Sequence, residues 1–169
     1  MHGLANRKNL ALRHRLDHEG VAAFADSQRY LEAAHEAGLR CAVVSASANT
    51  ATIIERAGLG SLIDEQVDGN TIKSQRLRPK PAPDTLLAAC RQLGTTPQQT
   101  VLFETTLDGI DAGRAAGFAL IVAVEPTGQA DTFRAHGAHV VIADLGALLD
   151  PTLAAPSDHR PKTRSPLPG

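Results

Sequence analysis

Residues 39–50 read LRCAVVSASANT, and this stretch decides the fold class. Its first part, 39–45, is a short apolar run with adjacent valines, followed by a polar cluster. Such a run is typical of a strand that is buried on both faces, as in a parallel sheet. Asn49 or Thr50 is then expected to cap a helix. The stretch therefore predicts a strand followed by a helix, the repeating unit of an α/β fold.

The same alternation continues along the chain. Alternating buried strands and helices imply a parallel sheet that is covered by helices on both sides, with right-handed connections. Ser27 is expected to cap the helix that precedes the first strand. Further strands are predicted at 62–67, 100–103, 118–124 and 139–143, and helices at 7–18, 27–37, 49–57, 83–93, 106–116 and 129–136, with one helical turn from 96.

Composition sets limits on the kind of protein. The chain has 169 residues, of which 43% are hydrophobic and 21% charged, and this balance is that of a globular domain. The net charge of −1 predicts no general affinity for nucleic acid or for an anionic membrane. Cys41 and Cys90 have neither metal-ligand spacing nor a disulfide pattern, and we expect both to be buried. These features favour a cytoplasmic protein.

Polar residues follow the predicted strands, where an open parallel sheet binds its ligands. A serine hydroxyl and nearby backbone N–H groups would donate to phosphate oxygens, a lysine would neutralise their charge, and a carboxylate would hold magnesium. Each residue alone has an ordinary structural explanation, as a turn residue, a solvated lysine or a first-turn acid. Together they predict a phosphate site that comprises Ser45, Ala46, Ser47, Asn49, Lys80 and Glu104.

Other candidate groups are better explained by structure than by chemistry. Asp108 and Asp111 are expected to be surface or first-turn acids of a helix. Asp64 and Asp68 are expected to form turns beside a strand. The histidines lack the spacing of a zinc site, and no glycine-rich dinucleotide loop is present.

Three motifs make the pattern specific. VVSAS at 43–47, KPAPD at 80–84 and FETTLDGIDAGRAAG at 103–117 resemble the second, third and fourth motifs of haloacid dehalogenase-like hydrolases, with the β-phosphoglucomutase-like subgroup as the nearest match. The resemblance extends over about 6–149. It implies that Ser45 and Lys80 bind the transferring phosphoryl group and that Glu104 is a magnesium-side carboxylate. It also implies that Ala46, Ser47 and Asn49 face the substrate, and that Lys8, in a stretch similar to the family's helical cap, reaches toward it.

Two departures from the family pattern affect the expected activity. The first family motif, an Asp-x-Asp that supplies the nucleophile, does not occur in this sequence. Thr105 occupies the place of a second acid in the fourth motif. Loss of a catalytic nucleophile typically costs on the order of 10^4 to 10^6 in rate, so we expect little or no turnover by this chain. The strand that carries the missing motif would lie at the centre of the sheet, between the strands that end at Ser45 and near Glu104.

The sequence therefore predicts an α/β fold with an incomplete Rossmann-like parallel sheet, in which the central first strand is absent. We expect a remnant of a helical cap at 1–24, a core at 25–150 and a disordered tail at 151–169. The function implied by resemblance is that of a magnesium-dependent phosphatase or phosphomutase acting on a small phosphorylated metabolite. The alternatives are a non-catalytic phosphate-binding or interaction protein, or half of a split enzyme whose partner chain supplies the missing strand.

Overall fold

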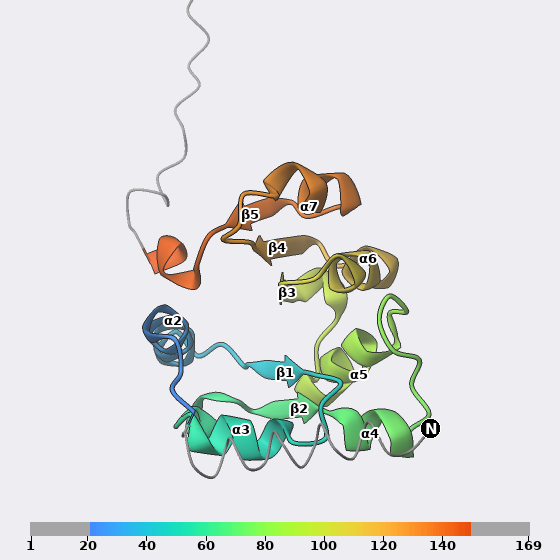
Figure 1. Cartoon of the computed structure of the whole chain (residues 1–169). Helices are drawn as coiled ribbons and strands as arrows, with labels where there is room; N and C mark the ends of the chain where they lie inside the picture. Colours follow the sequence, from blue (N-terminus) through green and yellow to red (C-terminus); the bar gives the residue numbers. More distant parts are fainter. Residues whose placement is uncertain (1–20, 150–169) are drawn as a thin grey trace, which may run out of the picture.

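The computed structural model of the chain describes residues 21–149 (Figure 1). The helix expected at 7–18, the side chain of Lys8 and the tail expected at 151–169 lie outside the described residues. Within them, no helix is long and apolar enough to cross a bilayer.

Five short strands form two parallel sheets, which confirms the predicted fold class. In the first sheet Ala42 lies opposite Glu65, and in the second Val101 lies opposite Leu120. The strands are β1 (Ala42–Val44) and β2 (Glu65–Val67) in one sheet, and β3 (Val101–Glu104), β4 (Leu120–Val124) and β5 (Val140–Ile142), in that order, in the other.

Six α-helices precede or connect these strands in the described residues, and two of them, α4 and α5, lie between β2 and β3. They are α2 (Ala25–Glu36), α3 (Thr50–Arg56), α4 (Gly69–Ser74), α5 (Asp84–Leu93), α6 (Leu107–Ala116) and α7 (Ala130–His136). Short 3-10 turns occupy Gly60–Leu62, Pro97–Gln99 and Leu145–Leu149.

One local prediction is wrong, and one helix was not predicted. The cap expected at Ser27 is wrong, because α2 begins two residues earlier, with Phe24 at the N-cap and no side-chain hydrogen bond there. Helix α4 was not predicted from the sequence. Its start depends on Asp68, whose carboxylate accepts hydrogen bonds from two backbone N–H groups of the first turn.

The larger hydrophobic core lies where α6 packs on the second sheet. Ile110, on α6, and Ile121, on β4, are almost completely buried in it. Gly113 permits this close packing, because a Cβ atom there would lie 2.3 Å from Leu102 Cδ2. The helix then ends at Gly117, whose φ of 79° is in the left-handed region that favours glycine.

The two sheets are not hydrogen-bonded to each other, and no strand lies between β1 and β3 in the described part of the chain (Figure 1). A cavity of about 550 Å³ is lined by residues of both strands. The strand expected at 39–45 was predicted to be buried on both faces, but all three residues of β1 are only half-buried. The open edge toward the cavity is the physical reason for that difference.

Candidate functional site

The loop after β1 is held by hydrogen bonds of its own serines. Ser45 Oγ accepts a hydrogen bond from Ser47 N at 3.2 Å, and Ser47 Oγ accepts one from Asn49 N at 3.1 Å. Thr50 Oγ1 donates to Ser47 O at 2.7 Å. Each serine hydroxyl thus acts as an acceptor within the loop and keeps its own hydrogen for donation.

The start of α4 supports this loop from the side of β2. Gly69 N donates to Ser47 O at 3.1 Å, and a Cβ atom at Gly69 would lie 2.6 Å from Ala46 O. Asp68 is buried and accepts from Thr71 N at 2.8 Å and from Asn70 N at 3.0 Å. These hydrogen bonds, first that from Thr71 N, lower the pKa of Asp68 below its usual 3.8, although burial acts in the opposite direction. Asp68 was expected to form a turn beside a strand, and it instead caps the first turn of helix α4.

Lys80 and Glu104 meet at the end of β3. The ammonium of Lys80 contacts Glu104 Oε1. The other oxygen, Oε2, accepts from Thr106 Oγ1 at 3.2 Å and from Thr105 N at 3.3 Å. Glu104 is 7% exposed and the Lys80 side chain 24%, so this ion pair is largely removed from water.

The position of the Glu104 carboxylate requires a glycine in the next helix. A Cβ atom at Gly109 would lie 2.0 Å from Glu104 Oε2 and 2.1 Å from its Cδ. Thr106 caps the same helix turn by accepting a hydrogen bond from Gly109 N at 3.1 Å. Helix α6 therefore starts directly against the carboxylate.

A second ion pair, between Arg78 and Asp84, joins the two ends of the segment that carries Lys80. The guanidinium of Arg78 donates from Nη2 to Asp84 Oδ1 at 2.7 Å and from Nε to Oδ2 at 3.0 Å. Arg78 N also donates to Asp84 Oδ2. These hydrogen bonds from the Arg78 side chain lower the pKa of Asp84 to about 2. The Asp84 carboxylate therefore links the two ends of the turn on which Lys80 lies.

The structure brings together two of the three groups on which the predicted site depends. Lys80 and Glu104 are in direct contact, whereas no hydrogen bond joins Ser45 to either of them within residues 21–149. Asn49 is buried, Ser45 and Ser47 are half-buried and Ala46 is exposed. Asp108 is an exposed first-turn acid of α6, as expected.

Sequence reasoning missed one buried acid at the same edge. Glu125 directly follows β4 and is 8% exposed. Its carboxylate accepts from Thr127 N at 2.7 Å and from Gln129 N at 2.6 Å, and it also contacts the Thr127 hydroxyl. These hydrogen bonds, first that from the Thr127 side chain, lower the pKa of Glu125. Its position after the apolar run 118–124 could have indicated a strand-end carboxylate.

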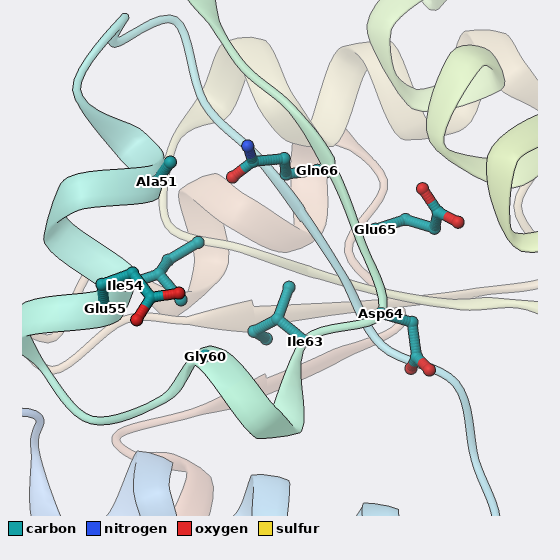
Figure 2. Close-up of a pocket in the computed structure, with 8 residues that line it drawn as sticks. All are labelled: Ala51, Ile54, Glu55, Gly60, Ile63, Asp64, Glu65 and Gln66. Carbon is teal, nitrogen blue, oxygen red and sulfur yellow. The ribbon is translucent and has the colours of Figure 1, made fainter.

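A separate pocket lies beside α3 and β2 (Figure 2). It has a volume of about 310 Å³ and includes the acids Glu55, Asp64 and Glu65, but none of the predicted site residues. Figure 2 shows Asp64 and Glu65 on the opposite side of this pocket from Glu55. Asp64 was expected to form a turn, but its carboxylate instead accepts a hydrogen bond from Cys41 N, 23 residues away, at 2.7 Å. This pocket is therefore not part of the candidate site.

Known proteins match this chain over the region that contains the three sequence motifs. A model of the haloacid dehalogenase-like hydrolase family matches residues 5–117. The chain belongs to this family. The match includes the Ser45 loop, Lys80 and Glu104.

The β-phosphoglucomutase of Mycobacterium tuberculosis (strain CDC 1551 / Oshkosh) is 45% identical over 152 residues, which are 88% of this chain and 58% of that protein. This similarity supports the predicted β-phosphoglucomutase-like subgroup.

Solved structures of haloacid dehalogenase-like proteins have the same fold. One, from Deinococcus radiodurans R1 with bound phosphate and sodium, is 30% identical with a TM-score of 0.66, covering 79% of this chain and 59% of that one. The β-phosphoglucomutase of Clostridium difficile has a TM-score of 0.64 at 21% identity, covering 76% of this chain and 53% of that one. The chain thus spans somewhat over half the length of these relatives.

Haloacid dehalogenase-like hydrolases generally use magnesium, so we tested whether the site fits this ion. Magnesium needs oxygen ligands in near-octahedral arrangement, often from one or two carboxylates together with substrate phosphate. Both oxygens of Glu104 already have partners, and Thr105 supplies no second carboxylate. Within residues 21–149, no group of three or more potential metal-ligating side chains is present. The described residues alone therefore do not form a magnesium site.

Proposed function

We propose that this chain carries most of the phosphoryl-binding site of a β-phosphoglucomutase-like phosphatase or phosphomutase that acts on a small phosphorylated metabolite. The observation that carries the proposal is the contact of Lys80 with Glu104 at the end of β3. The contact supports the proposal, because it joins a cation to a largely buried carboxylate at the carboxyl end of β3, and open parallel sheets bind ligands beyond such strand ends.

The Ser45 loop supplies the neutral donors of the proposed site. Ser45 Oγ keeps its hydrogen for a phosphate oxygen while it accepts from Ser47 N. The ammonium of Lys80 would then turn from Glu104 toward the incoming anion, because a phosphate dianion carries more charge than a carboxylate. Ala46, Ser47 and Asn49 would face the rest of the substrate, and Lys8 would reach it from the cap.

Catalytic turnover needs a nucleophile, which phosphate binding does not. No Asp-x-Asp is present in the 169 residues to supply an attacking carboxylate. We propose that this chain by itself binds phosphate but releases little or no product from phosphate monoesters. We assign no step to magnesium, because the described residues do not form a site for it.

Binding can be tested with inorganic phosphate, followed by phosphorus NMR or calorimetry. Lys80→Gln should weaken phosphate binding about tenfold, through loss of one charge-assisted contact. Lys73→Gln is the matched control, because Lys73 lies in the last turn of α4 and is exposed. Equal affinity of both variants for phosphate would contradict the proposed site.

Turnover can be tested with p-nitrophenyl phosphate and magnesium. We expect release of p-nitrophenol by the chain to equal that of the buffer. A measurable rate that Lys80→Gln abolishes and Lys73→Gln leaves unchanged would show that the chain is catalytic after all. Such a rate would leave the binding role of Lys80 intact and overturn the proposed lack of turnover.

A further inference from the structure

The segment around Lys80 has few backbone groups that can hold it in place. Residues 79, 81 and 83 are prolines, and proline has no N–H group to donate. The backbone closes one turn there, from Ala82 N to Pro79 O at 3.0 Å, with Lys80 inside it. The path of the chain on either side of this turn therefore depends on contacts that side chains make.

The Arg78 side chain makes such a contact at the start of α5. Its guanidinium donates to both oxygens of the Asp84 carboxylate, from Nη2 to Oδ1 at 2.7 Å and from Nε to Oδ2 at 3.0 Å. The Arg78 backbone N–H donates to the same carboxylate at 3.1 Å. A forked pair of this kind fixes the direction of the two groups as well as their distance.

Asp84 belongs to a firmly anchored helix. It is the first residue of α5, and its side chain is 23% exposed. The same helix buries Leu86 in the larger hydrophobic core and Ala89 in the second hydrophobic cluster. Because α5 is packed on both sides, its first carboxylate is a fixed point, to which Arg78 ties the chain that leads to Lys80.

The Lys80 ammonium needs such support more than a shorter side chain would. Lysine carries its charge at the end of a long flexible stem, so the ammonium has a defined place only when the backbone beneath it is fixed. The ammonium reaches Glu104, 24 residues further along the chain. A shift of the backbone at Lys80 would change this contact and also the reach of the ammonium toward an anion.

We propose that Arg78, through its forked pair with Asp84, is a positioning residue that holds the Lys80 ammonium in place and thereby sets the affinity for phosphate. The inference rests on the proposed phosphate-binding role of Lys80. The Arg78 side chain is 72% exposed, and ion pairs at such surfaces contribute little to stability. Loss of the pair therefore affects phosphate affinity more than folding.

Arg78→Lys separates the position of Lys80 from the charge of Arg78. The lysine keeps the positive charge but cannot form the fork. The affinity of the 169-residue chain for inorganic phosphate, measured by calorimetry, should fall about three- to tenfold, no further than for Lys80→Gln. Arg91→Lys is the control, because Arg91 is exposed in the last turn of α5, and it should leave the affinity unchanged. Unchanged affinity in Arg78→Lys would overturn the proposal.

Asp84→Asn gives effects of opposite sign for charge and for position. Removal of a negative charge should strengthen the binding of an anion, whereas loss of the pair with Arg78 should weaken it. We expect phosphate affinity to fall about threefold or more, because Lys80 is no longer held. Tighter binding of phosphate by Asp84→Asn would show that charge alone matters and that the positioning role is wrong.

Two further measurements distinguish positioning from a general structural role. In a Lys80→Gln background, Arg78→Lys should cause no further loss of phosphate affinity, because Arg78 acts through Lys80. A further loss as large as in the unaltered chain would contradict the proposal. The urea midpoint of Arg78→Lys should lie within about 0.5 M of the unaltered chain. A larger fall would make the pair an element of the fold and not a positioning device.

The position of Lys80 can also be measured without phosphate. Proton NOEs between the Lys80 and Glu104 side chains should weaken at least about twofold in Arg78→Lys and Asp84→Asn, because the backbone beneath Lys80 is released. Arg91→Lys should retain them. NOEs that neither Arg78→Lys nor Asp84→Asn weakens would overturn the positioning role, whatever the phosphate affinities are.

The failure of this inference is distinguishable from that of the proposed function. If Lys80→Gln weakens phosphate binding but Arg78→Lys does not, Lys80 binds phosphate and the role of Arg78 is wrong. If Lys80→Gln leaves phosphate binding unchanged while Arg78→Lys weakens the NOEs, the proposed function has failed, and Arg78 positions Lys80 without setting phosphate affinity.

Discussion

The ammonium of Lys80 contacts the carboxylate of Glu104, and this contact joins the segment before α5 to the end of β3. The two residues are 24 positions apart in the sequence. Glu104 is almost completely buried, and three donors, including Lys80, surround it.

Glu104→Gln should destabilise the folded chain. The substitution leaves the partly buried Lys80 ammonium without its counter-charge, and we expect a loss of about 1–3 kcal/mol in the free energy of unfolding. Urea denaturation of the two proteins measures this loss. Glu36→Gln is the control, because Glu36 is exposed near the end of α2, and its effect should be within about 0.5 kcal/mol. Equal losses for both variants would mean that the contact is not important for stability.

Gly109→Ala should lower stability through a steric conflict with Glu104. The new Cβ atom would lie 2.0 Å from Oε2, so the carboxylate or the helix must move, at a cost of about 1–3 kcal/mol. The same change in a Glu104→Ala background should be neutral or stabilising by up to about 1 kcal/mol, because alanine favours helix over glycine. A double-mutant cycle from denaturation curves measures the difference. Equal losses of stability in both backgrounds would mean that the new Cβ atom does not conflict with Glu104.

Asp68 should make stability depend on acid pH. Its folded-state pKa is held below the ordinary 3.8, so its contribution is fully present above about pH 5 and is lost as the pH falls through the lowered value. Asp68→Asn should therefore flatten the acid limb of a plot of unfolding free energy against pH. The exposed Asp108→Asn serves as the control and should leave that limb in place. An unchanged acid limb in Asp68→Asn would contradict this assignment.

The pKa of Asp84 should rise when its guanidinium partner is removed. With Arg78 present the pKa of Asp84 is about 2, chiefly because of the hydrogen bonds from the Arg78 side chain. Arg78→Gln removes these bonds and the positive charge, so the pKa should move toward 3.8. Carbon-detected NMR titration of the carboxyl measures it. Arg91→Gln, an exposed change in the last turn of α5, should leave the pKa of Asp84 near its original value.

Much of the fold could be predicted from local sequence patterns. The apolar run at 100–103 and the stretch from Asp84 to Gly94 correspond to β3 and α5 within one or two residues, because strand burial and helix ends depend on neighbouring residues. The order of Ser45, Lys80 and Glu104 along the chain led to the prediction of a common edge, of which the structure shows the contact between Lys80 and Glu104.

Contacts between distant residues could not be predicted in this way. The start of α4 depends on the hydrogen bonds of a buried Asp68, and the place of Glu104 depends on the absence of a Cβ atom at Gly109. These are matters of packing between segments, which residue type and spacing do not specify.

The sequence by itself determined the α/β class, the family and the residues that stand at the ends of its strands. Only the tertiary structure decided that Lys80 meets Glu104, and that residues of both β1 and β3 line one cavity. The physical reason is that a strand's own sequence specifies its burial pattern, whereas its neighbours are selected by hydrogen bonding and packing across the whole sheet.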